Sequence, residues 1–158
     1  MGADSELWSG GVTAAIGAHA GARVSPARRW SLSVAAGDMW ATGAPRSVES
    51  QTLRALVGVG YDLEPSVRLG LAGDVRMMLA QQGSSPASNA ATAGLVATAR
   101  YVARLGSFEL SAGPQGEILY RPIIVQVSGD EVLRVPTALL SLSVDGTLGV
   151  GAAADGSP

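Results

Sequence analysis

Apolar and polar residues alternate along most of the chain, and the stretch from Val67 to Leu79 shows this clearly. Leu69 and Leu71 lie on one parity of this stretch, whereas Arg68 and Asp74 lie on the other. Side chains of a β-strand point alternately to opposite faces, so the pattern predicts strands with one apolar and one charged face. Roughly seven such segments follow one another, which predicts an all-β fold.

Short breaks and long polar stretches alternate between these segments. The short breaks lie at Ser25–Arg29, Asp62–Ser66 and Arg104–Ser107, and the long stretches at Ala41–Gln51, Ala80–Thr92 and Arg121–Pro136. An antiparallel up-and-down meander has this arrangement when one of its ends carries only tight turns. The last long stretch contains two β-rich pieces around the sequence SGDE, which predicts a hairpin beyond the end of the sheet.

The aromatic residues indicate which face meets water. All of them share the apolar parity: Trp30, Tyr61, Tyr101 and Phe108 near the short breaks, and Trp8, Trp40 and Tyr120 near the opposite strand ends. A soluble core would place its bulkiest side chains in the middle of the strands, where packing is densest. Aromatic rings at both ends instead match the two interfacial girdles of a membrane barrel. The apolar face is therefore predicted to face lipid.

The distance between the two predicted girdles fits a membrane. Trp30 and Trp40, like Phe108 and Tyr120, are separated by about ten to twelve residues, or roughly 33 to 40 Å of strand. With a strand tilt of about 40°, that length rises roughly 25 to 30 Å, close to the apolar band of an outer-membrane barrel.

The charged parity then lines the inside of the barrel. It is predicted to form an interior charge network of Arg54, Arg68, Asp74, Arg76, Arg100, Glu109, Glu117, Arg121 and Asp145, with Arg23, Asp62 and Arg104 on the same parity. Mixed signs favour mutual pairing over a selectivity ring of one sign. An eight-stranded barrel has just enough interior for side chains to fill. We therefore predict one domain, residues 1–158, forming an antiparallel up-and-down transmembrane β-barrel with about seven visible strands and eight expected.

Two alternatives and two irregularities stay open at this point. Residues 91–105 are rich in Ala and could form an amphipathic helix. The charged parity could also be the solvated face of a soluble sheet, as in a lipocalin-like or β-sandwich binding protein. Asp38 and Pro114 fall on the apolar parity, which a bulge or a strand end would explain.

With alternating strands, aromatic girdles and unequal connections, the chain resembles the small eight-stranded outer-membrane β-barrel proteins of Gram-negative bacteria. The resemblance implies the bacterial outer membrane as location, and outer-membrane lipid and the barrel assembly machinery as partners. Two features differ from that family: residues 1–10 do not read as a signal peptide, and residues 148–158 end without an aromatic residue. With seven strands the termini would lie on opposite sides, so we predict that an N-terminal strand and a signal peptide are missing.

Few residues offer chemistry. The chain has no Cys and one histidine, His19, which excludes thiolate and multi-histidine metal sites. The net charge of -2 gives no electrostatic reason for nucleic-acid binding. His19 lies on the inward parity without an acid nearby in sequence, so a structural role is favoured over a catalytic one. The predicted function is structural anchoring or a loop-mediated interaction with an unknown partner, without enzymatic activity, cofactor or metal. A narrow passive pore for small solutes is the alternative.

Overall fold

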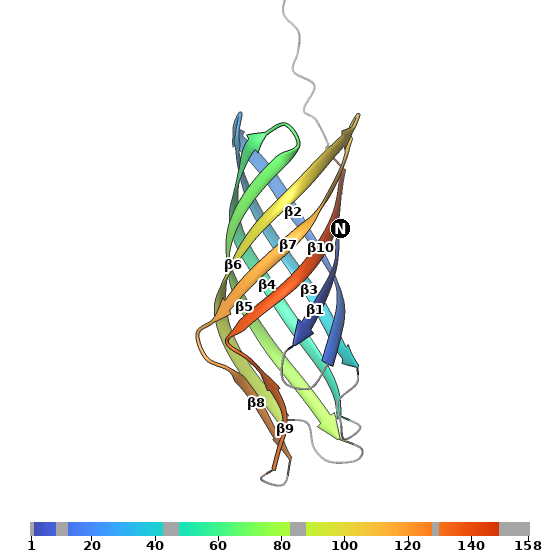
Figure 1. Cartoon of the computed structure of the whole chain (residues 1–158), viewed down its shortest axis with the longest axis vertical. Coiled ribbons are helices and arrows are strands. Elements are labelled where there is room, and N and C mark those ends of the chain that lie inside the picture. The colour runs from blue at the N-terminus through green and yellow to red at the C-terminus, as the bar shows by residue number, and fades with distance from the viewer. Residues whose placement is uncertain (1, 9–12, 43–47, 83–87, 128–129, 149–158) are drawn as a thin grey trace, which may run out of the picture.

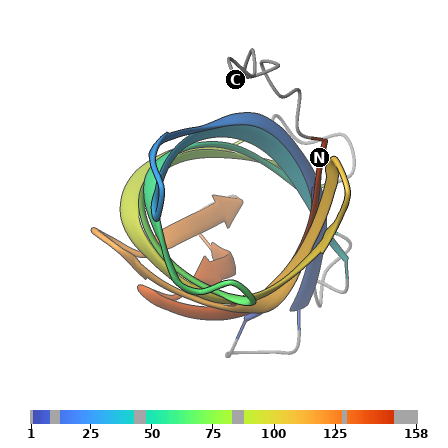
Figure 2. The ribbon, with the colours of Figure 1, turned by 90° about the horizontal axis from the view of Figure 1, so that it is seen from above.

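Eight antiparallel strands pair in a closed ring in the computed structural model, which describes residues 2–8, 13–42, 48–82, 88–127 and 130–148. The order around the ring is β1-β10-β7-β6-β5-β4-β3-β2 (Figures 1 and 2). These strands are β1 (Gly2–Trp8), β2 (Thr13–Ala27), β3 (Trp30–Thr42), β4 (Val48–Glu64), β5 (Val67–Gln82), β6 (Ser88–Leu105), β7 (Phe108–Leu119) and β10 (Ala138–Leu148). The predicted all-β up-and-down architecture is confirmed.

Alternating burial follows the alternating sequence. In β10, the inward Leu139, Ser141 and Ser143 are buried, whereas Leu140 and Leu142 between them are exposed. The helical alternative for residues 91–105 is wrong, because that segment lies within β6. The described part of the chain contains no helix long and apolar enough to cross a membrane.

The two ends of the barrel differ, as the connections predict. Tight turns join β2 to β3, β4 to β5 and β6 to β7 at one end, here called the short-turn end, at the top of Figure 1. The last of these turns contains Gly106 with φ 64°, a left-handed conformation that glycine adopts without a steric penalty. The opposite strand ends form the other end of the barrel, here called the long-loop end.

The eighth strand is β1, so the prediction of a missing N-terminal strand is wrong. β1 pairs with β2 on one side and with β10 on the other, which closes the ring. The sequence concealed this strand because it has only seven residues and neither parity is cleanly apolar: Ser5 shares the parity of Ala3 and Leu7, and Trp8 shares that of Asp4 and Glu6. With eight strands, β1 begins and β10 ends toward the same end of the barrel, the short-turn end.

Neither irregularity on the apolar parity is a bulge or a strand end. Asp38 pairs in regular register with Ala18 and Leu53. At Pro114 the pairing of β7 with β6 lapses between Gln115 and Ala112, with the same register on both sides. Proline has no N–H to donate to the ladder, which explains the lapse without any register shift.

The predicted hairpin in the last long connection is confirmed. β8 (Ile123–Val127) and β9 (Asp130–Val135) form a separate two-stranded sheet, which hangs below the barrel in Figure 1. Its base is packed rather than free, because Ile123 and Val135 are buried in an apolar cluster. This cluster, here called the apolar core, consists of Ala15, Met39, Met78, Ala80, Leu119, Ile123, Val135 and Leu139. The long-loop end is thus filled by side chains from the wall and the hairpin.

Candidate functional site in the barrel interior

The outer face of the wall carries the aromatic side chains. Trp30, Trp40, Tyr101, Phe108 and Tyr120 are exposed, and Tyr61 is half-buried with its ring centroid 4.9 Å from that of Trp30. Trp8 is the last residue of β1, and its side chain lies outside the description.

One of the aromatic residues near the short turns, Tyr61, contacts a neighbouring turn through its hydroxyl. Arg29, in the turn between β2 and β3, donates a hydrogen bond from Nη1 to the Tyr61 hydroxyl at 3.3 Å. This hydrogen bond raises the pKa of the Arg29 guanidinium above its ordinary value. The Tyr61 ring thus lies on the apolar wall while its hydroxyl is directed to a charged turn.

Four charged side chains form a sealed ion-pair group inside the barrel, here called the buried quartet: Arg54, Asp74, Arg76 and Glu117. Arg54 contacts Asp74 at 3.3 Å through Nε and Glu117 at 3.1 Å through Nη2. Arg76 contacts Asp74 at 2.8 Å and also pairs with Glu117. The four side chains are at most 2% exposed, so two cations and two anions neutralise one another without bulk water.

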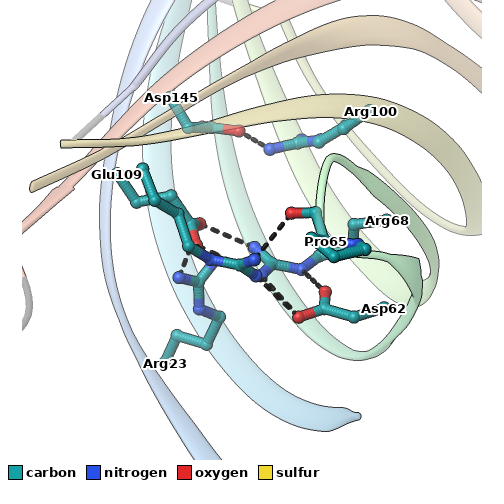
Figure 3. A network of polar contacts seen from close by, with 8 residues as sticks. Arg23, Asp62, Pro65, Arg68, Arg100, Glu109 and Asp145 are labelled. Carbon is teal, nitrogen blue, oxygen red and sulfur yellow. Dashed lines mark hydrogen bonds and ion pairs between the residues drawn. The ribbon is translucent and has the colours of Figure 1, made fainter.

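A second group, here called the mouth cluster, lies at the short-turn end: Arg23, Asp62, Arg68, Arg104 and Glu109. Figure 3 labels all of them except Arg104. Arg68 bridges Asp62 at 2.6 Å and Glu109 at 2.7 Å. Glu109 also pairs with Arg23 at 2.6 Å, and Arg104 reaches Asp62 at 2.8 Å and the Pro65 carbonyl at 2.6 Å. Unlike the quartet, this cluster has solvent contact, since Arg104 is 43% exposed.

Between the two groups, Asp145 pairs with both His19 and Arg100. The His19 Nε2 atom lies 2.5 Å from Asp145 Oδ1. His19 and Asp145 both pair with Gly2 of β1, and glycine has no side chain to separate them. Sequence reasoning missed this contact because the two residues are 126 positions apart and meet only when β1 closes the ring.

Eight of the nine residues in the predicted charge network lie inside the barrel in these three groups. Arg121 is the exception, and its predicted interior position is wrong. β7 ends at Leu119, so the alternation that would have directed Arg121 inward stops before it. Its side chain is exposed and donates to the Ala91 carbonyl at 2.9 Å from Nη2.

A cavity of about 560 Å³ lies between the buried quartet and the mouth cluster. Residues of every barrel strand except β1 line it, so it occupies the lumen rather than the outer face. Its wall includes Gly58, Gly70, Thr98, Ser111 and Gln115. The described residues contain no group of three His, Asp or Glu side chains that could hold a metal ion.

Comparisons with known proteins support the fold. No family model and no curated relative matches this chain. Among solved structures, the chain is similar to Neisserial surface protein A, with a TM-score of 0.53 and 15% sequence identity. The match covers 92% of this chain and 90% of that chain, so the similarity spans the whole barrel. At this identity the likeness shows a shared barrel fold.

Proposed function

We propose that the chain is an outer-membrane β-barrel protein of Gram-negative bacteria, which anchors its long-loop end at the cell surface for interaction with a partner. The observation that carries the proposal is the inverted distribution of polarity. Large apolar side chains such as Leu71, Val75 and Ile118 are exposed on the outer face, while the buried quartet lies inside. A soluble barrel has the opposite distribution, because exposed apolar surface is costly in water.

One charged side chain on the outer wall needs an explanation. Asp38 of β3 lies on the outward parity between Ala36 and Trp40, and its Oδ2 accepts a hydrogen bond from Gln51 at 2.5 Å. It lies two residues before Trp40 of the girdle. On a tilted strand this places Asp38 about 5 Å closer to the middle of the barrel than Trp40. Charge near the interface costs far less than at the bilayer centre, so this position agrees with a membrane.

The filled long-loop half favours anchoring over transport. The apolar core and the buried quartet occupy the lumen across several strands. Water cannot pass through such packing unless the side chains move apart. The hairpin β8–β9 offers Ile124, Gln126 and Arg134 as exposed side chains next to this closed end. We propose this hairpin as the contact for the partner, with outer-membrane lipid and the barrel assembly machinery as further partners and no catalytic role.

A narrow passive pore is the second candidate, and the luminal cavity favours it. Conduction requires a continuous water path, which the buried quartet interrupts. Recording the full chain in planar bilayers separates the two candidates. Stable single-channel conductance would favour the pore, whereas an electrically silent membrane with inserted protein would favour anchoring.

The membrane proposal itself is tested by the protein's solubility and its gel migration. The full chain, folded in detergent, should migrate differently in cold and boiled samples, because closed barrels resist unfolding by cold dodecyl sulfate. It should also precipitate when detergent is removed without lipid. A monomer that stays soluble without detergent would overturn the proposal and favour a soluble binding protein.

A further inference from the structure

We propose that the 560 Å³ cavity is a binding chamber for small organic anions carrying a sulfonate or carboxylate group, which enter from the short-turn end. The proposal goes beyond the anchoring role, since neither membrane insertion nor the hairpin is needed for a solute to bind there. Four features of the lumen support it: the space, the sealed side, the charge of the entrance, and a buried donor.

The space is large enough for a solute and is formed by small residues. Ligand sites commonly enclose about 300 to 1,000 Å³. Inward positions of β2, β4 and β5 that would otherwise hold side chains are Gly21, Gly58, Gly60 and Gly70, all of which line the cavity. A Cβ at Gly70 would lie 2.4 Å from the Thr98 hydroxyl, so the wall is already in close contact there.

The chamber is closed on one side and approached from the other. On the long-loop side the next inward positions belong to the buried quartet: Glu117 lies two residues beyond Gln115 of the lining, and Asp74 two residues beyond Ala72. The quartet side chains are at most 2% exposed, so they close this side. On the short-turn side a second cavity of about 340 Å³ is lined by Gly106, Ser107 and Phe108. Arg23 and Thr147 line both cavities, so a solute that enters the outer one meets the chamber directly behind Arg23.

The entrance carries one more cation than anion. The mouth cluster contains three arginines, Arg23, Arg68 and Arg104, against the carboxylates of Asp62 and Glu109 (Figure 3). Both carboxylates are occupied by two or three arginine contacts. Clefts with low-dielectric walls focus such an excess and raise the local concentration of the opposite charge. The entrance therefore favours anions over cations.

Inside the chamber, a buried donor remains to be satisfied. Gln115 is 4% exposed and lines the cavity, and its Nε2 atom has no hydrogen-bond partner among the described residues. A buried amide without a partner costs free energy, which a ligand acceptor would recover. The hydroxyls of Ser31, Thr98 and Ser111 share the same wall. This lining suits a ligand that presents several acceptor oxygens.

The absence of Cys makes the test direct. Thr98→Cys places a thiol in the chamber wall, and it is treated with an anionic or a cationic alkylthiosulfonate of matched size in folded, detergent-solubilised protein. Each rate is divided by the rate of the same reagent with free mercaptoethanol. We expect the normalised rate of the anionic reagent to exceed that of the cationic one by about tenfold, within the range of electrostatic steering.

Three controls show whether the modification rate reports access to the chamber or only the general reactivity of a thiol. Met78→Cys, on the sealed side, should react with neither reagent, because Met78 is 1% exposed in the apolar core. Arg104→Gln in the Thr98→Cys background should bring the ratio of the two rates close to one. Should that variant fail to fold, raising the salt concentration should lower the same ratio, since salt screens exposed charges. Faster reaction with the cation, or no reaction with either reagent, would overturn the proposal.

Binding is measured by protection. Methanesulfonate at a saturating concentration should slow the modification of Thr98→Cys at least about twofold, compared with chloride at equal ionic strength. Modification at an unchanged rate would show that the chamber admits anions without binding them and would refute the binding site. Because the heat-dependent gel shift reports the barrel independently, a failed chamber and a failed membrane proposal give different results.

Discussion

The two halves of the barrel interior contain the same kinds of charged residue and yet differ in solvent contact. In the long-loop half, Arg76 and Glu117 are 1% exposed at their side chains; in the short-turn half, Arg104 is 43% exposed. The difference arises from the uncharged inward neighbours. Met39, Met78 and Leu119 fill the first half, whereas glycines and small hydroxyl residues line the second. Residue size between the charges therefore decides whether an ion pair is structural and dry or open to a solute.

The largest contrast should come from removing one acid in each half. Asp74→Ala leaves Arg54 and Arg76 with part of their compensation removed in a dry site, so we expect a loss of about 3 to 5 kcal/mol in the free energy of unfolding. Glu109→Ala in the mouth cluster should cost less, about 1 to 3 kcal/mol, because Glu109 is 12% and Arg104 beside it 43% exposed, so water can replace part of the lost contact. Urea-induced unfolding in lipid vesicles measures both, and equal losses would contradict the division into dry and wet halves.

A packing contrast should follow the same division. Met78→Ala opens a void in the apolar core, so we expect a loss of about 2 to 5 kcal/mol. Ser33→Ala faces the existing cavity, where its hydroxyl makes one long contact of 3.5 Å with the Gly58 carbonyl, and should change stability by less than about 0.5 kcal/mol. The same unfolding experiment compares them. A costly Ser33→Ala would show that the chamber wall is packed as tightly as the core.

A pair of adjacent positions tests the chamber half against the outer face. Leu71 is 54% exposed with its side chain on the outer face of the wall, whereas the neighbouring Ala72 is half-buried on the inward parity. Leu71→Arg puts a charge toward lipid and should cost about 2 to 4 kcal/mol, whereas Ala72→Arg places it in a polar space and should be tolerated. The folded fraction, read from gel migration after refolding into vesicles, reports the difference. Similar folded fractions for the two variants would contradict a lipid-facing outer wall and favour a soluble sheet.

The sequence was informative about local alternation and uninformative about what closes the ring. Leu71, Arg68 and Arg54 were placed correctly because each lies in a long strand whose period-two pattern is undisturbed. Arg121 was misplaced because the strand ends two residues before it, and strand boundaries leave no mark in such a pattern.

The failures concerning β1 and His19 have a common cause. A seven-residue strand with weak apolar positions gives little local signal, and its identity follows only from the unpaired edges of β2 and β10 that it joins. The contact of His19 with Asp145 depends on that closure. The division of the interior into two halves was also hidden from the sequence. Met78 and Gly70 share a strand and a parity, and only their neighbours in space show that one lies in the apolar core and the other in the chamber wall.

The last pair of variants tests the boundary between the halves, where we expect a smaller loss than in the buried quartet. His19 and Asp145 are 17% and 12% exposed at their side chains, intermediate between the buried quartet and Arg104. His19→Ala should therefore cost about 1 to 2 kcal/mol, less than Asp74→Ala and more than Ser33→Ala, because Asp145 keeps its pairing with Arg100. His19→Gln retains a nitrogen donor and should recover most of that loss, which thermal unfolding of the two variants in the same detergent would show. If both variants matched the parent chain, the contact at 2.5 Å would have no part in joining the ring, and closure would depend on the backbone pairing of β1 alone.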